Sequence, residues 1–147
     1  MKKIFLLLAL FVSIQNFAQE ETAKMPLRIS AQGNTIDVYL DSNNSKKTLT
    51  ITNKKEDESR LIIMNSDWKK EADFDRSFTL VNDKDEDLQI SFMSRMKGTS
   101  YALLTDIFTK AQKGKTYKLY TTATPTDPAI AATVRVRRIL LCSIAVK

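Results

Sequence analysis

Histidine is absent from this sequence, and no other feature of its composition excludes as much chemistry. Without an imidazole the chain can form neither a Ser-His-Asp nor a Cys-His catalytic arrangement, and it lacks every metal site that depends on a histidine ligand. No other pairing of a nucleophile with a base, and no cluster of metal-ligating side chains, is visible in the sequence. We therefore expect a protein that is not an enzyme and that holds no cofactor or metal ion.

Cysteine is almost as scarce, because Cys142 is the only one. A single cysteine excludes a disulfide within the chain, so packing must hold the fold together. Cys142 lies in the middle of an apolar run, and no residue near it in the sequence would lower the pKa of its thiol. We interpret Cys142 as a buried packing residue rather than a reactive thiol.

No hydrophobic run is long enough to cross a membrane, which requires about 20 residues. The first 18 residues nevertheless contain the basic pair Lys2-Lys3, the apolar run Ile4 to Val12 and a more polar stretch that ends at Ala18. This three-part order is typical of a cleavable secretory signal. We predict cleavage after Ala18, a flexible lead-in over residues 19–26, and a soluble periplasmic or extracellular protein without a membrane span.

Strong charge of one sign is also lacking. Cleavage would leave 129 of the 147 residues, with 21 of the 23 basic side chains against 17 acidic ones. The lysines are scattered as pairs, whereas nucleic-acid binding usually requires a dense basic stripe, so we expect no nucleic-acid partner. The remaining length is that of one domain, predicted over residues 27–147.

Short β-rich runs separated by polar turns dominate this domain. The run Thr48 to Thr52 shows the pattern clearly, because Leu49 and Ile51 alternate with threonines. The same criteria predict strands at 27–30, 35–40, 48–52, 60–64, 77–81, 88–93, 116–123 and 133–146. The sequence therefore indicates an all-β fold.

One segment departs from the β pattern. Between Ser100 and Lys113 the apolar residues recur at helical spacing, Thr99 or Ser100 would cap the start, and Gly114 stands where a helix would end. Many short strands with one short helical crossover, at about residues 100–113, predict a sandwich of two antiparallel sheets.

The last predicted strand contains an irregularity. On one face of residues 134–146 only Arg138 interrupts a series of apolar side chains. A β-bulge at Arg137-Arg138 would keep this charge out of the core. The alternative is a strand that is covered on both faces around 139–141, and we favour the bulge.

The run Ala111 to Tyr120 resembles the turn and strand that carry the tyrosine corner of immunoglobulin-like sandwiches. Tyr117 matches the corner tyrosine, and the resemblance implies that Leu119 and Ile51 face the core. It also implies a core position for Trp68. The resemblance concerns the fold alone, because this architecture serves many functions.

Two segments are candidate recognition surfaces. The loop formed by Pro125, Thr126, Asp127 and Pro128 joins the last two predicted strands, and its two prolines would reduce the ordering cost of binding. A rigid connection without a partner explains the loop equally well.

Arg135, Arg137 and Arg138 form the second candidate, as contacts for an anionic partner. On an exposed strand they would also discourage edge-to-edge aggregation, and we favour this protective role.

Two clusters of acidic residues have simpler explanations than a site. The run Asp83 to Asp87 has the carboxylate spacing of a calcium loop, but Leu88 replaces the required glycine and Ser94 the closing glutamate, so a solvated turn is expected. Trp68 and Phe74 stand among the acids Asp67, Asp73 and Asp75 and would form an aromatic and acidic patch for a sugar. Packing of Trp68 in the core is the favoured alternative.

These observations predict an exported, non-enzymatic binding or structural module that acts on a protein or a polysaccharide through a loop end or a sheet edge. An accessory subunit of an envelope complex with an obligate protein partner is the alternative. A carbohydrate-active enzyme is a weaker third hypothesis.

Overall fold

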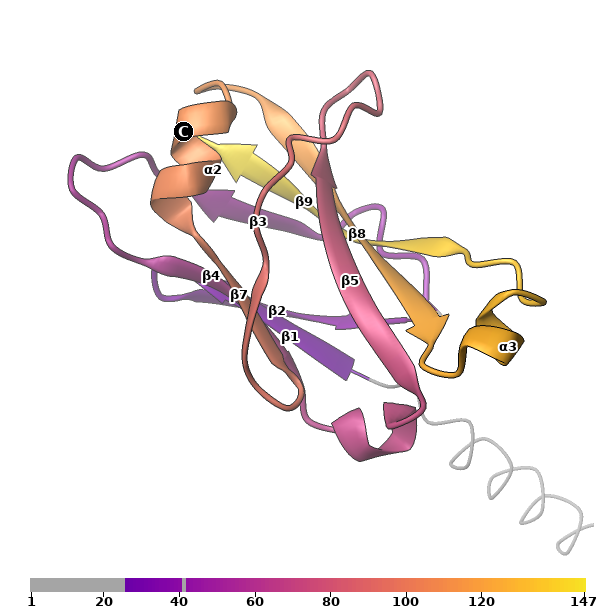
Figure 1. Ribbon diagram of the computed structural model, residues 1–147. Coiled ribbons are helices and arrows are strands. Elements are labelled where there is room, and N and C mark those ends of the chain that lie inside the picture. Colours follow the sequence, from indigo (N-terminus) through magenta and orange to yellow (C-terminus); the bar gives the residue numbers. More distant parts are fainter. Residues whose placement is uncertain (1–25, 41) are drawn as a thin grey trace, which may run out of the picture.

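The computed structural model describes residues 26–40 and 42–147, and two facing β-sheets form its body (Figure 1). The five-stranded sheet has the order β2-β1-β4-β7-β6 and consists of β1 (Pro26–Ala31), β2 (Asn34–Tyr39), β4 (Arg60–Asn65), β6 (Met93–Met96) and β7 (Thr99–Leu103). The four-stranded sheet has the order β3-β9-β8-β5 and consists of β3 (Thr48–Ile51), β5 (Phe74–Val81), β8 (Thr116–Pro125) and β9 (Arg138–Val146). The expected mostly-β architecture is confirmed.

Alternating side chains place one face of each sheet in a shared core. In β1, Leu27 and Ile29 are fully buried while Arg28 between them is exposed. Leu49 and Ile51 of β3 are buried in the same way, as their alternation with threonine predicted. One cluster contains buried apolar residues from both sheets, among them Leu27, Ile29, Ile63, Leu80, Leu119 and Ile144.

The prediction that both sheets are antiparallel throughout is wrong at one pair. β3 runs parallel to β9, with Thr48 opposite Ser143 and Ile51 opposite Val146. Both sequence neighbours of β3, namely β2 and β4, belong to the other sheet, so β3 finds its partner far along the chain. Parallel strands require a long connection, and the whole chain from β4 to β8 supplies it.

The predicted helix is present but shorter than expected. The helix α2 covers Leu104–Lys110, because Ser100 to Leu103 belong to β7 and pair with β4. Pairing across the sheet thus overrides the helical spacing of these residues, and Leu103 precedes the helix without a side-chain cap. Two very short helices, η1 (Trp68–Glu71) and α3 (Pro128–Ala131), were not predicted. As expected, α2 connects a strand of one sheet with a strand of the other.

Two predicted strand segments are absent. Residues 88–92 form an irregular segment alongside β5, where Leu88 donates its backbone N–H to the carbonyl of Leu80 at 2.9 Å. Residues 133–137 are also irregular and exposed, so β9 begins only at Arg138.

The bulge in β9 lies further along than predicted. The register between β8 and β9 shifts after the pair Leu119 and Cys142, because Tyr120 pairs with Leu140. Leu141 is therefore the additional residue, and both Leu141 and Cys142 are buried. No bulge is needed at Arg138, because the strand starts there and its side chain remains outside the core.

The predicted signal peptide, residues 1–18, lies outside the described residues, as does the predicted lead-in except for Pro26, which begins β1. Within residues 26–40 and 42–147, no helix has the length and hydropathy that a membrane-spanning helix requires.

Candidate functional site

A cleft of about 400 Å³ opens where β5 and β6, the edge strands of their sheets, lie on the same side of the sandwich. We call it the Trp68 cleft. Its lining comprises Ile63, Asn65, Trp68, Glu71, Ala72, Phe74, Asp75, Arg76, Phe78, Ser94, Lys97, Gly98 and Ser100. It therefore combines an apolar floor between the sheets with polar groups at its mouth, which is the usual composition of a ligand site.

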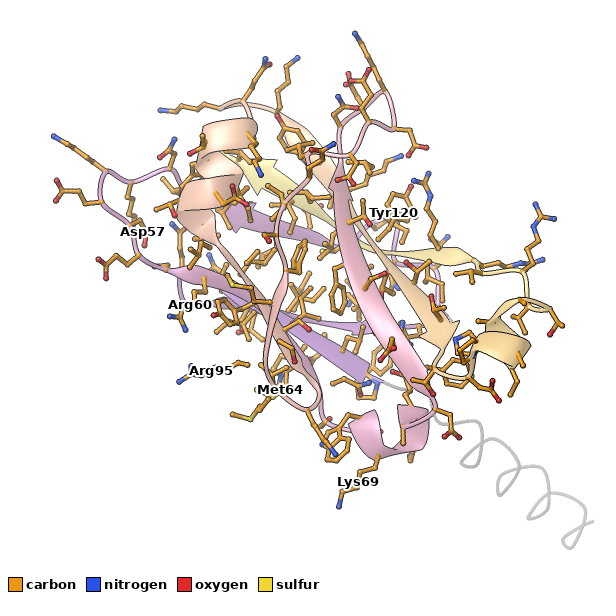
Figure 2. All side chains as sticks on the ribbon, in the orientation of Figure 1. Asp57, Arg60, Met64, Lys69, Arg95 and Tyr120 are labelled. Atoms are coloured by element: carbon orange, nitrogen blue, oxygen red, sulfur yellow. The ribbon has the colours of Figure 1, made fainter. Side chains whose placement is uncertain are left out.

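Trp68 is half-buried in the wall of the cleft, so the prediction that it packs in the core is wrong. The chain turns sharply after β4 because Asn65 Oδ1 accepts a 3.0 Å hydrogen bond from the backbone N–H of Asp67. This turn places Trp68 in η1, at the end of the sandwich, rather than in a strand. Lys69 and Lys97 hold their ammonium groups 5.7 Å and 5.3 Å from the centre of the indole ring. Figure 2 shows Lys69 pointing outward from η1.

An ion pair between Glu71 and Arg76 forms the polar wall of the cleft. Arg76 contacts both carboxylate oxygens, with Nε 3.0 Å from Oε2 and Nη2 bonded to Oε1, and the two side chains are only 17% and 12% exposed. Asn65 Nδ2 donates to the same Oε2 at 2.9 Å, and Arg76 Nη1 donates to Thr121 Oγ1 at 3.2 Å. The Glu71 carboxylate thus receives three hydrogen bonds from within the protein, which hold it in place in the wall of the cleft.

The sequence predicted this site in part. Phe74, which is 46% exposed, and Asp75 both line the cleft beside Trp68. Asp67 and Asp73 do not line it: Asp67 forms an ion pair with Lys70 at 3.6 Å. The sequence analysis missed the Glu71–Arg76 pair, because it links a short helix to the following strand at a spacing of five residues that matches no regular helix or strand pattern.

The predicted recognition loop is fixed next to this end of β5. Pro125 is buried, and Thr126 donates from its backbone N–H and its hydroxyl to the carbonyl of Asp73, at 2.9 Å and 3.2 Å. Asp127 caps α3 by accepting a 2.9 Å hydrogen bond from the N–H of Ala129, and Pro128 occupies the first turn. The backbone of the loop is thus bonded to Asp73, which directly precedes the strand that lines the cleft.

The three arginines differ in their surroundings. Arg138 forms an ion pair with Asp85, in which Nη2 lies 2.6 Å and 2.7 Å from the two carboxylate oxygens, and its guanidinium lies 4.1 Å from the ring centre of Tyr120, which Figure 2 labels. Arg135 and Arg137 lie in the exposed segment before β9, and no ion pair involving them is recorded within the described part of the chain. The guanidinium of Arg138 is therefore already paired with a carboxylate, whereas Arg135 and Arg137 are exposed.

The acidic turn between β5 and β6 is organised by Asn82, whose role the sequence analysis missed. Its Oδ1 accepts hydrogen bonds from the backbone N–H groups of Lys84 and Glu86, each at 2.9 Å, and its Nδ2 donates to Glu86 Oε2 at 2.7 Å. Among the described residues no three His, Cys, Asp or Glu side chains gather in a way that would hold a metal ion. The side chain of Asn82 therefore organises the backbone of this turn through its own hydrogen bonds.

Comparison of the chain with protein-family models, with curated proteins and with solved structures found no match.

Proposed function

We propose that this protein is an exported, non-enzymatic binding module and that the Trp68 cleft is its ligand-binding site. The observation that carries the proposal is the pairing of an exposed Phe74 ring with the half-buried Trp68 beside the hydrogen-bonded Glu71–Arg76 pair. A site whose polar groups are already held in place loses little entropy when a ligand binds. Such a cleft is suited to hold a ligand without transforming it.

Two side chains support the non-enzymatic part of the proposal. The carboxylate of Glu71 is engaged by Arg76 and Asn65. The thiol of Cys142 is fully buried, and desolvation raises its pKa to about 12, so that it stays protonated and unreactive near neutral pH.

Export is proposed from the basic start, the apolar run and the polar stretch that ends at Ala18. The test is N-terminal sequencing of the protein recovered from its native host. The mature chain is expected to begin at or within a few residues of Gln19. Recovery of the full-length chain from the cytoplasm would contradict export.

The finer description of the fold, an immunoglobulin-like sandwich, is also a proposal. Tyr117 supports it, because its hydroxyl accepts a 2.6 Å hydrogen bond from the backbone N–H of Gln112, as a corner tyrosine would. Leu119 and Ile51 support it as well, since both are fully buried. Trp68 departs from the pattern, since it lines the cleft instead of the core.

The binding site can be tested through Trp68, because it is the only tryptophan. Its fluorescence is expected to change on titration with a ligand from a panel of soluble oligosaccharides and peptides, and Phe74→Ala is expected to weaken binding at least about tenfold. Tyr39→Ala is the matched control, since it removes an exposed aromatic ring from β2 at the other edge of the five-stranded sheet. The site assignment fails if no ligand in the panel perturbs Trp68, or if both variants weaken binding equally.

A different observation favours the alternative, an accessory subunit with an obligate partner. The outer face of the five-stranded sheet exposes several large apolar side chains: Met64, Met93, Met96 and Leu103. Met64 and Met96 both lie opposite Thr99 and Met93 lies opposite Tyr101, whereas Leu103 pairs with Arg60 toward the other end of β7. We call this the methionine face, and Figure 2 shows Met64 pointing away from the core. An apolar patch of this kind often marks an interface, and methionine adapts well to a partner surface.

The test of this alternative is recovery of a stable complex after mild extraction from the native host. Replacing Met64 and Met96 together with serine should abolish that complex and leave the fold intact, because both side chains are exposed. Ile130→Ser, an exposed apolar position on α3, should leave it unchanged. Recovery of the protein as a free monomer would contradict the alternative.

A further inference from the structure

The free edge of β5 borders the Trp68 cleft, and two hydrogen bonds fix the direction of its backbone groups. The carbonyl of Asp73 faces β8, because it accepts from Thr126, which directly follows that strand. The carbonyl of Leu80 faces away from β8, because it accepts from Leu88. The backbone N–H and C=O groups of successive residues point to opposite sides of a strand. Those of odd-numbered residues in β5 therefore point toward β8, and those of even-numbered residues point toward the free edge.

Only the C-terminal part of this edge, from Phe78 to Val81, is covered. There Leu88 bonds to Leu80, Val81 bridges to Asp87, and the ring of Phe92 packs 5.6 Å from that of Phe78. From Phe74 to Phe78 no second strand among the described residues pairs with β5. The N–H and C=O groups of Arg76 therefore face outward at the mouth of the cleft, and those of Phe78 do so at the limit of the covered part.

The edge strand on the opposite side of the cleft, β6, has features that hinder pairing with a further strand. β6 has four exposed residues, and its register shifts between Ser94 and Met96, so that Arg95 interrupts the pairing. Shortness, a bulge and a charge are devices that prevent an edge from recruiting another strand. β5 has neither a bulge in its pairing nor a proline, it is eight residues long, and the charge of its Arg76 is already paired with Glu71.

We propose that the ligand of the Trp68 cleft is an extended peptide segment of a partner protein, which adds as a strand to β5 along residues 74–78. This inference rests on the proposed function of the cleft. Alternate side chains of this segment would point between the sheets, where Ile63, Phe78 and Trp68 line the cleft, so an apolar anchor is required. The ammonium groups of Lys69 and Lys97 beside Trp68 favour an acidic residue next to that anchor.

A peptide fits these observations better than a saccharide. A sugar ring stacks on an open aromatic face, but two lysine ammonium groups already lie over the ring of Trp68. A sugar also has no regular series of donors and acceptors at the spacing of a strand, so it would leave the edge of β5 unpaired. Strand addition satisfies the backbone and fills the cleft at the same time.

The experiment uses the mature protein and a displayed library of random ten-residue peptides. Selected sequences are expected to carry an apolar residue beside an acidic one and to perturb Trp68 fluorescence. Amide hydrogen exchange, followed by NMR, should slow about tenfold or more at Arg76 and Phe78 when such a peptide saturates the protein. Ser77 is the internal control, because its backbone already faces β8 and its exchange should change little.

The outcomes separate this inference from the function on which it rests. Peptides that bind without slowing exchange at Arg76 and Phe78 would overturn strand addition while leaving the Trp68 cleft as a binding site. So would an oligosaccharide that perturbs Trp68 when no peptide is enriched. If neither class of ligand perturbs Trp68, both the inference and the proposed function fail.

A peptide-side control tests the backbone contacts directly. N-methylation of alternate backbone nitrogens of a selected peptide removes donors on one side of the added strand only. One set of methylated positions should reduce affinity at least about tenfold, and the alternate set should have little effect. Equal loss at both sets would show that the peptide does not bind as a strand.

Discussion

Gly98 lies directly against Trp68: a Cβ built on Gly98 would stand 2.7 Å from Trp68 Cδ1 and 2.6 Å from the carbonyl oxygen of Asn65. The shape of the Trp68 cleft therefore depends on a position that only glycine can fill. Gly98 also has a φ of +79°, which other residues rarely adopt.

The first prediction follows from this contact. Gly98→Ala should destabilise the protein by about 2 to 3 kcal/mol and shift the fluorescence of Trp68, because the indole must move. Gly33→Ala is a matched control, since Gly33 has a φ of +80° but nothing lies within 4 Å of its Cβ position. It should cost only about 1 kcal/mol, measured by chemical denaturation. Equal costs for the two variants would show that Trp68 is not held by Gly98.

The second prediction concerns Cys142 and alkaline pH. Its pKa is raised from 9.0 to about 12 by burial, so between these values the folded protein keeps a proton that the unfolded chain releases. The contribution of the protonated thiol to the free energy of unfolding is therefore fully present below pH 9 and is lost as the pH rises toward 12. Unfolding titrations between pH 8 and about pH 11 should show a steeper decline for the natural protein than for Cys142→Ala. In native buffer a thiol reagent should label Cys142 slowly, and rapid labelling would contradict its burial.

The third prediction tests the hydrogen bond between Tyr117 and Gln112. Tyr117→Phe should lower the free energy of unfolding by about 1 kcal/mol, because the N–H of Gln112 loses its partner in a half-buried setting. Tyr39→Phe, at an exposed ring, should leave stability unchanged in the same denaturation assay. An unchanged free energy of unfolding for Tyr117→Phe would contradict this role of the hydrogen bond, because water would then replace the hydroxyl without cost.

The fourth prediction compares two ion pairs. Glu71→Gln should destabilise by about 3 kcal/mol, because it leaves the guanidinium of Arg76 largely buried without a countercharge. Asp37→Asn removes the partner of Arg28 from an exposed pair, whose side chains are 62% and 45% exposed, and should change stability little. Thermal unfolding of both variants against the natural protein is the measurement, and similar losses would contradict the structural role of Glu71.

The sequence was sufficient where a residue's role follows from its near neighbours. The alternation around Leu49 and Ile51 located β3 and its buried face, and the apolar run around Cys142 indicated a buried thiol. Gly114 was expected to stop the helix, but α2 ends at Lys110 with Ala111 as its C-cap, and the φ of +84° at Gly114 belongs to the turn that follows.

Residues whose place depends on distant partners were not predictable. Ser100 has helical surroundings in the sequence but pairs with Ile63 of β4 in the sheet. Trp68 was expected in the core from the immunoglobulin-like resemblance, but the turn set by Asn65, which has no strong sequence signal, places it in the wall of the cleft. Likewise, Arg138 faces Asp85, which is 53 residues away, and no local pattern reveals such a pair.

The parallel pairing of β3 with β9 bears on how this chain reaches its native state. Hydrogen bonds from Lys147 to Ile51 and from Asn53 to Lys147 extend that pairing across almost 100 residues of intervening sequence. Contacts between such distant segments form slowly, because a large loop must close before they stabilise anything. β3 has no other neighbour in its sheet, so it remains an unpaired strand until β9 is present. A chain of this topology completes its four-stranded sheet only after β9 is in place, which makes the docking of β3 a late step of folding.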